Sequence, residues 1–182
     1  TSAVDFNGTD SFEAQVSDGL LDDNITVNVT VSNVNDRPVI NDGNATVSLT
    51  VIEDTATSFT LTSLIAIDVD TASVLLVWNL DSNASHGVAS VSGSGASPLT
   101  FSFLPDANFT GLDSFDVRVS DGVIDDLIRV DLNVTNVNDP PHFTSVPVAQ
   151  ANPLVPYLYT VTAADADGNA TPLTLTAAPK PN

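Results

Sequence analysis

Apolar and polar side chains alternate along several stretches of this chain. Phe115, Val117 and Val119 alternate with polar neighbours, and residues 128–134 and 99–103 show the same pattern. A period of two places successive side chains on opposite faces of a strand, so each stretch is predicted to bury one face and expose the other. Further strands are expected near 46–52, 58–67, 73–80 and 87–92. We predict antiparallel strands and find no segment with the period of a helix.

A sequence repeat organises these strands. The 35 residues that begin at Phe6 align with the 35 that begin at Phe109, an offset of 103 residues, and 19 aligned positions are identical. This repeat divides the chain into one complete unit and two partial units. Residues 36–138 are predicted to form the complete unit, residues 1–35 the C-terminal part of a preceding one, and residues 139–182 the N-terminal part of a third.

The number and spacing of the strands predict a fold class. About seven short strands within roughly 100 residues, separated by Gly, Pro, Asn and Asp, are typical of a β-sandwich. The predicted class is therefore all-β: tandem antiparallel Greek-key β-sandwiches, one complete and two partial. The chain contains no Cys, so no disulfide can stabilise these units. It also contains no Met and no long apolar run, from which we expect a processed product or a piece of a longer protein.

The net charge of the chain excludes some classes of binding partner. Four Lys and Arg residues stand against 23 Asp and Glu residues, a formal net charge of -19. Such a surface repels nucleic acid and anionic lipid, because both bind proteins through Lys and Arg. Of the acidic residues 21 are Asp, and only Glu13 and Glu53 are Glu. Asp favours turns and holds its oxygens close to the backbone, as Ca²⁺ sites in loops require.

Short motifs follow one another in order along the complete unit. They read NDRPVI, IEDT, IAIDVD, LPDANFTGLDSF, VSDG and NVNDPP. In this order they resemble the cadherin-like tandem repeats of large bacterial and archaeal surface proteins. The third unit looks like a dystroglycan-type cadherin domain or a related immunoglobulin-like domain. The resemblance covers essentially the whole chain, and it implies cadherin/Ig-like sandwiches joined end to end.

The resemblance also implies Ca²⁺ at the two domain junctions. In cadherin-like arrays a linker similar to D-x-N-D-N lies between acidic residues of the preceding and the following domain. Here the linkers are residues 33–37 and 136–140. In each, the first Asp of the pattern is Asn and the last Asn is Arg or Pro, so each linker has one carboxylate fewer.

The order of strands assigns acidic residues to each junction. In an up-and-down run of strands, the loops after the second and sixth strands lie at the pole of the incoming linker, and the end of the first strand lies at the opposite pole. We expect Asn35, Asp36, Asp68, Asp70 and Asp121 at the first junction, and Glu53, Asn138, Asp139, Asp165 and Asp167 at the second, with Asp106 near the family's acidic corner. Oxygen ligands suit Ca²⁺ better than Zn²⁺. Alternatively, these acids only cap turns and are solvated.

Other signals in the sequence concern glycosylation and catalysis. Eight N-x-S/T sequons make Asn7, Asn24, Asn28, Asn44, Asn83, Asn108, Asn133 and Asn169 candidate glycosylation sites. Alternation places Asn28 and Asn133 on the solvent face, although Thr-rich strands also produce sequons that are never modified. His86 and His142 have no nucleophile elbow or paired-carboxylate cleft beside them. Because neither histidine has such a catalytic arrangement, we predict no enzyme activity. Trp78 lies in an apolar strand and is expected in the core.

Three functions remain open at this stage. The leading hypothesis is a Ca²⁺-rigidified stalk segment of an extracellular adhesin or cell-surface protein. Its partners would be neighbouring repeats of the same or adjacent chains, and surface glycans or proteins would bind through other domains. Neither nucleic acid nor membrane insertion is expected. The first alternative is a subunit of a polymerised surface filament or layer, completed by neighbouring chains. The second is an accessory ligand-binding module of an exported enzyme.

Overall fold

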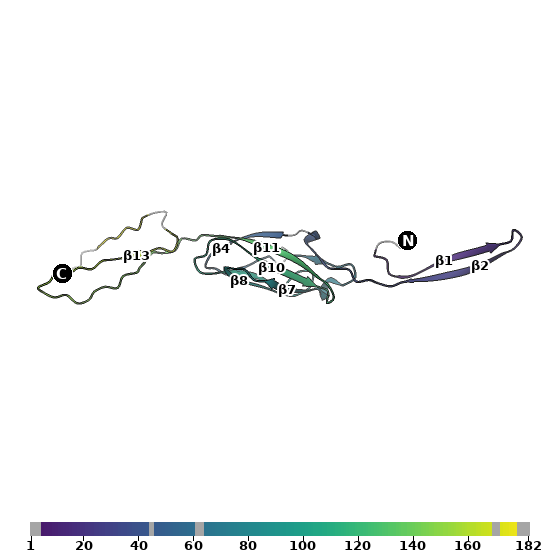
Figure 1. Cartoon of the computed structure of the whole chain (residues 1–182), viewed down its shortest axis with the longest axis horizontal. Helices are drawn as coiled ribbons and strands as arrows, with labels where there is room; N and C mark the ends of the chain where they lie inside the picture. Colours follow the sequence, from purple (N-terminus) through teal and green to yellow (C-terminus); the bar gives the residue numbers. More distant parts are fainter. Residues whose placement is uncertain (1–4, 44–45, 61–63, 169–171, 178–182) are drawn as a thin grey trace.

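The described chain consists of strands, loops and short turns. The computed structural model describes residues 5–43, 46–60, 64–168 and 172–177. Figure 1 shows an N-terminal hairpin, a central sandwich and a C-terminal part following one another along the long axis. The described residues contain no α-helix; their helical segments are the 3₁₀ turns η1 (Asn41–Gly43) and η3 (Ser73–Leu75). The predicted all-β class is confirmed.

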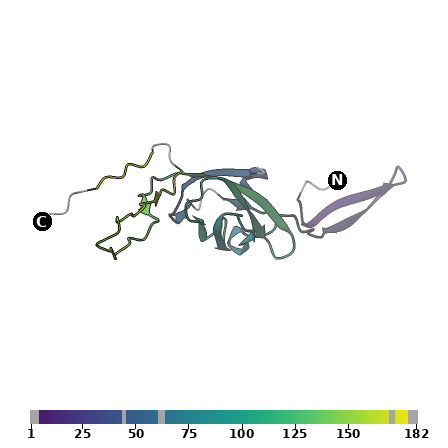
Figure 2. The ribbon, with the colours of Figure 1, turned by 60° about the vertical axis from the view of Figure 1, so that its left-hand side comes forward.

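The central unit is built on a seven-stranded sheet. Its strands are β4 (Thr46–Ile52), β5 (Thr57–Ser58), β7 (Val77–Ser82), β8 (Gly87–Ser94), β9 (Thr100–Pro105), β10 (Gly111–Ser120) and β11 (Asp125–Thr135). They lie in the order β4-β11-β10-β7-β8-β9-β5. A second, short pair is formed by β3 (Val39–Ile40) and β6 (Ala66–Ile67). Figure 2 shows how these strands curve around one interior.

One pair of strands departs from the predicted antiparallel arrangement. β4 pairs with β11 in parallel, in an unbroken register from Thr46 opposite Arg129 to Ile52 opposite Thr135. The reason is the direction of the chain through the unit. The first linker enters at one pole and the second leaves at the other, so the first long strand and the last strand run the same way. When they become neighbours, their pairing is necessarily parallel.

Two of the predicted strands are shorter than expected. In the described part of the stretch 58–67, strand structure is confined to the end of β5 and to β6, and the stretch 73–80 opens with η3 before β7 begins at Val77. Residues 61–63 lie outside the described residues. In η3, the backbone N–H of Leu75 donates to the carbonyl of Ala72 at 2.8 Å. Residues 73–75, whose apolar side chains suggested the start of a strand, therefore form this turn instead.

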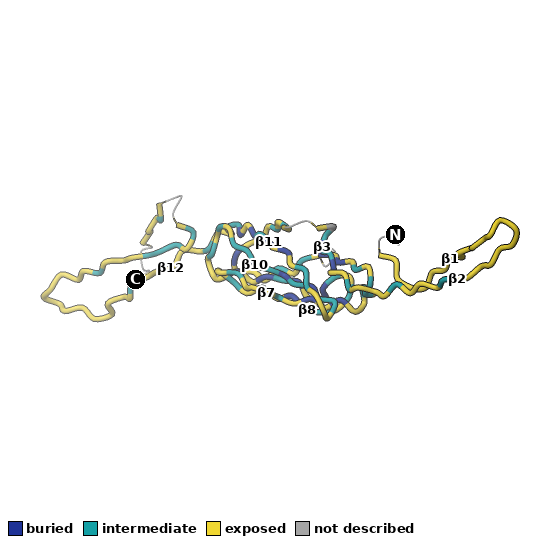
Figure 3. Tube along the Cα trace, turned by 45° about the vertical axis from the view of Figure 1, so that its right-hand side comes forward, coloured by how far each residue is buried: buried dark blue, intermediate teal, exposed yellow. Residues whose placement is uncertain are grey.

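The core lies inside the central unit, as Figure 3 shows. Inward residues of the long strands alternate with exposed ones, as the period of two predicts. The largest buried side chains are Trp78, Phe101, Phe103, Phe115, Ile40, Leu64, Leu76, Ile128 and Leu132. The indole N–H of Trp78 donates to the carbonyl of Gly95 at 2.9 Å, so the buried ring has a hydrogen-bond partner.

The N-terminal hairpin has the same register as the last hairpin of the central unit. β1 (Gly8–Ser17) pairs with β2 (Asp22–Val31), with Gly8 opposite Val31, just as Gly111 lies opposite Val134. The apolar face of the hairpin, however, is not covered by the part of the chain that the structure describes. Phe12 is 57% exposed, whereas its repeat counterpart Phe115 is 1% exposed.

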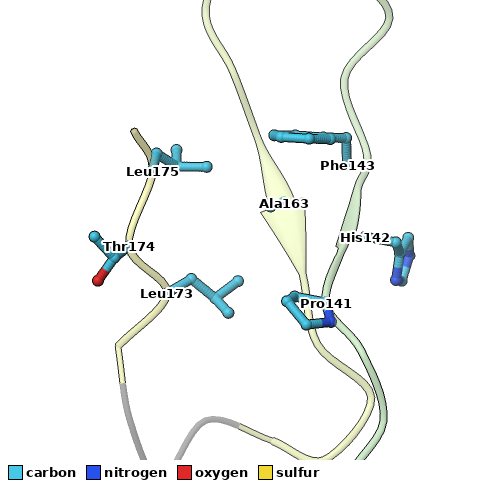
Figure 4. Close-up of a pocket in the computed structure, with 7 residues that line it drawn as sticks. All are labelled: Pro141, His142, Phe143, Ala163, Leu173, Thr174 and Leu175. Carbon is cyan, nitrogen blue, oxygen red and sulfur yellow. The ribbon is translucent and has the colours of Figure 1, made fainter. Parts of the chain in front are cut away.

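The C-terminal part contains little regular structure. β12 (His142–Phe143) pairs with β13 (Ala163–Ala164), and the Thr144 N–H extends this ladder by donating to the carbonyl of Thr162. An apolar pocket of about 190 Å³ lies beside this pair and is lined by Pro141, His142, Phe143, Ala163, Leu173, Thr174 and Leu175. In Figure 4, Leu173 and Leu175 point across it toward Pro141 and Phe143.

The repeat provides a matched pair of core substitutions. Phe115→Ala should lower the free energy of unfolding of the central unit by about 3–5 kcal/mol, because it leaves a cavity in a close-packed core. Phe12→Ala should change it by less than about 0.5 kcal/mol, since that ring contributes nothing to the core. Urea unfolding followed by fluorescence of Trp78, the only Trp, measures both. Equal losses in the two variants would show that the hairpin packs on the central unit.

Candidate metal centre at the domain junctions

The first linker is held by carboxylates from two loops of the central unit. The Asp36 N–H donates to Asp70 Oδ2 at 2.6 Å, which ties the linker to the loop after β6. Asn35 Nδ2 donates to Asp121 Oδ2 at 2.7 Å, which ties it to the β10–β11 turn. The same amide group donates to the carbonyl of Asp36 at 2.9 Å. The structure thus brings together four of the five residues that were expected at this junction.

Asp68, the fifth residue, shapes the loop that presents Asp70. Asp68 Oδ1 accepts the backbone N–H groups of Asp70 and Thr71 at 2.8 and 2.7 Å, an Asx turn that fixes the loop. Asp68 Oδ2 is buried and has no hydrogen-bond partner among the residues that the structure describes. A buried carboxylate oxygen without a partner is costly, and native structures normally satisfy such atoms.

The second linker repeats this arrangement with residues of the third unit. The Asp139 N–H donates to Asp167 Oδ2 at 2.6 Å, and the Asp167 N–H donates to Asp165 Oδ1 at 3.0 Å. Asn138 Nδ2 donates to the carbonyl of Asp139 at 3.0 Å. Asp139 Oδ2 is buried as well, and none of the described residues forms a hydrogen bond with it. The third unit differs in sequence from the second, yet its Asp-x-Asp motif holds the linker in the same way.

Glu53 reaches the second linker from the end of β4. It is only 2% exposed, and its Oε1 accepts the N–H of Val137 at 2.8 Å. Its own N–H donates to the carbonyl of Thr135, which continues the β4–β11 ladder. The parallel pairing of these strands therefore places this carboxylate against the linker that leaves β11. Acidic groups from the second and third units meet at this junction.

The carboxylates at the junctions repel one another. Burial raises the pKa of Asp36, and the charges of Asp70, Asp5 and Asp68 raise it further. Burial likewise raises the pKa of Asp139, with added repulsion from Asp54, Asp167, Glu53 and Asp165. Each linker Asp is therefore harder to ionise than an isolated Asp, first because it is partly desolvated and then because negative charge is concentrated around it.

Asp121 has the opposite shift. The N–H of Ile124 lowers its pKa most, followed by the amide of Asn35 and the N–H of Val123. Its Oδ1 accepts both backbone N–H groups of the turn, at 2.7 Å from Ile124 and 2.6 Å from Val123. This carboxylate remains charged at the edge of the first junction because three donors stabilise it.

Asp106 lies in the loop that follows β9, where the Asn108 N–H donates to Asp54 Oδ1 at 2.9 Å. Asp106 is exposed, and the hydrogen bonds recorded for it are backbone ones, to His86 and from Phe109. Two acids that the sequence analysis did not select come closer, Asp54 at the second linker and Asp5 at the first. Asp54 follows Glu53 directly. Asp5 precedes Asn108 by one repeat length, and both adopt a left-handed backbone, with φ of 61° and 58°.

The junction side chains do not form a finished metal site. Within the described residues, no three Asp, Glu or His side chains converge as a coordination shell. Their oxygens accept hydrogen bonds from the linker and from their own loops instead. The arrangement provides a set of oxygen ligands around each linker, and binding a cation would require some of these hydrogen bonds to be exchanged.

Arg37 gives the first junction a clamp that the second lacks. Its guanidinium Nη2 lies 2.7 Å from Asp126 Oδ1 and 3.1 Å from the carbonyl of Asp125. Asp126 Oδ2 accepts the N–H of Ile40 at 3.0 Å, so one carboxylate holds both the linker and β3. The second linker has Pro140 at this position, which cannot form an ion pair.

The other candidate residues lie on the surface. The sequon residues Asn7, Asn24, Asn28, Asn83, Asn108 and Asn133 are exposed, whereas Asn44 and Asn169 lie outside the described residues. Asn133 stands between the buried Leu132 and Val134, as alternation predicted. His86 stacks on Phe109 at 4.2 Å, and His142 lies exposed in β12.

Solved structures show similarity to cadherin domains. Extracellular domains 1–5 of protocadherin gamma B2 match with a TM-score of 0.54 and 15% identity, over 89% of this chain and 33% of that chain. Domains 1–4 of protocadherin gamma B7 match with a TM-score of 0.51 and 18% identity, over 89% of this chain and 42% of that one. At these identities the likeness concerns the fold.

An endo-fucoidan hydrolase of glycoside hydrolase family 107 also matches, with a TM-score of 0.45 and 22% identity, over 72% of this chain. This chain spans 19% of the hydrolase, so the match says nothing about activity here. The comparison with curated proteins found no match. Among the described residues, no helix has the length and apolarity needed to cross a membrane.

The sequence itself identifies the family. Residues 35–126, half of the chain, match the family described as Bacterial Ig domain. The match begins in the first linker and ends in β11, so it covers most of the central sandwich. The cadherin-like tandem arrangement and this match agree, and the chain belongs to the bacterial immunoglobulin-like domain family.

Proposed function

We propose that this chain is a spacer segment of an extracellular or cell-surface protein and that Ca²⁺ stiffens both of its junctions. The observation that carries the proposal is the pair of buried, unpartnered carboxylate oxygens, Asp68 Oδ2 and Asp139 Oδ2. One lies at each junction, where neighbouring acids already disfavour ionisation of the linker Asp. A bound cation would provide the missing partner and remove the repulsion.

The available ligands fit Ca²⁺ by their chemistry. Ca²⁺ takes six to eight oxygen ligands from carboxylates, amides and carbonyls in flexible geometry. The first junction offers Asp5, Asn35, Asp36, Asp68, Asp70 and Asp121, and the second offers Glu53, Asp54, Asn138, Asp139, Asp165 and Asp167. Mg²⁺ demands a tighter octahedral shell, which loops of this kind do not favour.

The effect of the ion would be mechanical. Each linker is a few residues long and donates hydrogen bonds to loop carboxylates, which belong to the central unit at the first junction and to the central and third units at the second. Ca²⁺ would convert these loops and the linker into one body and restrict bending between units. The apolar core lies away from both poles, so the sandwich would remain folded without the ion. The function supported is therefore control of stiffness, and no catalytic step is assigned.

The proposal extends to location and partners. Exposed sequons, an acidic surface and immunoglobulin-like units in tandem are typical of proteins outside the cell. The partners expected first are neighbouring repeats, because the β1–β2 hairpin exposes Phe12, Val16 and Ile25, whose repeat counterparts are buried. Strands of an adjacent repeat, in the same or another chain, would cover this face. If they belong to another chain, the protein would be a subunit of a surface filament.

Removing Ca²⁺ tests the proposal directly. With Ca²⁺ at 100 times its dissociation constant, each site should add about 2.7 kcal/mol to the stability of the bound state. The melting temperature should rise, and small-angle scattering should show a narrower range of shapes than in chelator. Mg²⁺ at the same concentration should have a weaker effect. Identical melting and scattering in Ca²⁺ and in chelator would contradict the proposal and leave the acids as turn residues.

Substitution of the bridging carboxylates separates the two sites. Asp70→Asn should weaken Ca²⁺ binding at the first junction by about tenfold or more, and Asp167→Asn should do the same at the second, because each loses a charged ligand. Asp116→Asn is the control, since Asp116 lies within β10 and contacts Ser82 instead. Isothermal titration calorimetry measures both affinities. Equal losses in all three variants would mean that net charge alone governs binding.

The Arg37 clamp should act independently of Ca²⁺. In chelator and at low salt, Arg37→Gln should destabilise the first junction by at most about 1 kcal/mol, because Arg37 is largely exposed. High salt should abolish the difference by screening the pair. Thermal unfolding at both ionic strengths measures it. A loss that persists at high salt would show that packing by the Arg37 side chain, and not its charge, holds the linker.

A further inference from the structure

The central sheet has one long unpaired edge. β4 is the terminal strand of the sheet, and on its outer side none of the described residues pairs with it. The opposite end of the sheet is β5, which has only two residues. A short terminal strand offers little backbone to a partner, whereas a seven-residue strand presents a row of free N–H and C=O groups.

β4 carries none of the usual features that block edge pairing. Its sequence, TVSLTVI, contains no charged residue, no Pro and no Gly. Its register with β11 is continuous over all seven residues, so no bulge turns the edge away. Natural sheets commonly protect such edges with Lys, Pro, bulges or short strands. This edge is also uncharged in a chain whose net charge is -19.

We propose that β4 pairs antiparallel with β4 of a second copy of this chain, which joins two central sheets laterally. The strand is complementary to itself about Leu49. In a two-fold pairing centred on that residue, Val47 lies opposite Val51 and Ser48 lies opposite Thr50. The same backbone groups are then donated and accepted by both copies, as an isologous contact requires.

The burial pattern of β4 supports a second copy as the occupant. Val47 and Leu49 face the interior but are only half-buried, whereas Val51 is buried. A second β4 would bring the same side chains beside them and extend the apolar layer across the two-fold axis. Ser48 and Thr50 face outward and are exposed, so their hydroxyl groups would meet as a cross-strand pair.

The affinity of one β4–β4 pair would be low, and added salt would raise it. One strand pair buries less surface than a stable protein–protein interface needs. Two chains of net charge -19 also repel each other, so added salt should strengthen the association by screening. Two antiparallel rods with the same repeat length would keep successive edges aligned and would gain from multivalency. This lateral contact is separate from Ca²⁺ binding at the poles.

Paired lysines on the edge strand test the inference against a matched control. Ser48→Lys with Thr50→Lys places two charges on the β4 edge, and Ser90→Lys with Ser92→Lys adds the same charge at exposed positions of β8, which has partners on both sides. Sedimentation equilibrium of the full chain measures association. The β4 variant should associate about tenfold more weakly than the parent, and the β8 variant should be unchanged within about twofold.

Cross-linking then tests the register. Because the chain has no Cys, Ser48→Cys protein mixed with Thr50→Cys protein should form the mixed disulfide more readily than either protein alone. Association that survives in the β4 lysine variant would overturn the inference and indicate another surface, such as the exposed face of β1–β2. A chain that stays monomeric at millimolar concentration and high salt would overturn it as well.

Discussion

The parallel pairing of β4 with β11 is the constraint on which the rest of this structure depends. It follows from a chain that enters the unit at one pole and leaves at the other. Because the two strands run in the same direction, Glu53, which follows β4, accepts a hydrogen bond from the linker that leaves β11. The same arrangement makes β4 the last strand of its sheet. Linear extension of the rod and its one long open edge therefore share a single topological cause.

The stability of the unit and the geometry of the junctions depend on different residues. The sandwich is stabilised by a close-packed apolar interior around Trp78 and Phe115. The linkers are positioned by carboxylates whose charges oppose one another and by one ion pair, Arg37 with Asp126. Substitutions that leave cavities weaken the core, and salt hardly affects it. Salt and bound ions alter the interactions at the junctions, which depend little on the packing of the core. A protein built this way can change its flexibility without unfolding.

Much of this architecture could be predicted from the sequence, because alternation and repetition are local signals. The inward residues of β10 and β11 and the exposure of Asn133 followed from a period of two. The parallel neighbour of β11 could not be predicted in this way, since pairing depends on which distant strands become adjacent. The stretch 58–67 was also predicted only in part, because its apolar residues suggest one continuous strand, whereas residues 59–60 and 64–65 are not in a strand.

At the junctions, too, the residues that form a local sequence motif could be predicted, whereas the other residues could not. The Asp-x-Asp motifs and both linkers stand out in the sequence, and the structure places them together. Asp106 was selected by its place in a motif, and its role at the junction stays a prediction. Asp5 and Asp54, whose charges act on the linker Asp residues, both have a left-handed backbone, with φ of 61° and 57°, and the sequence motifs did not point to them.

The common register of the β1–β2 and β10–β11 hairpins has a consequence for folding. Both present the same pattern of side chains, and 19 of 35 aligned residues are identical, so either hairpin can satisfy much of the frame formed by β4, β7, β8 and β9. Adjacent repeats are known to exchange such elements during folding. The divergence of the third unit makes its segments poor substitutes for those of the second. Exchange is therefore expected more readily between the first and second units than between the second and third.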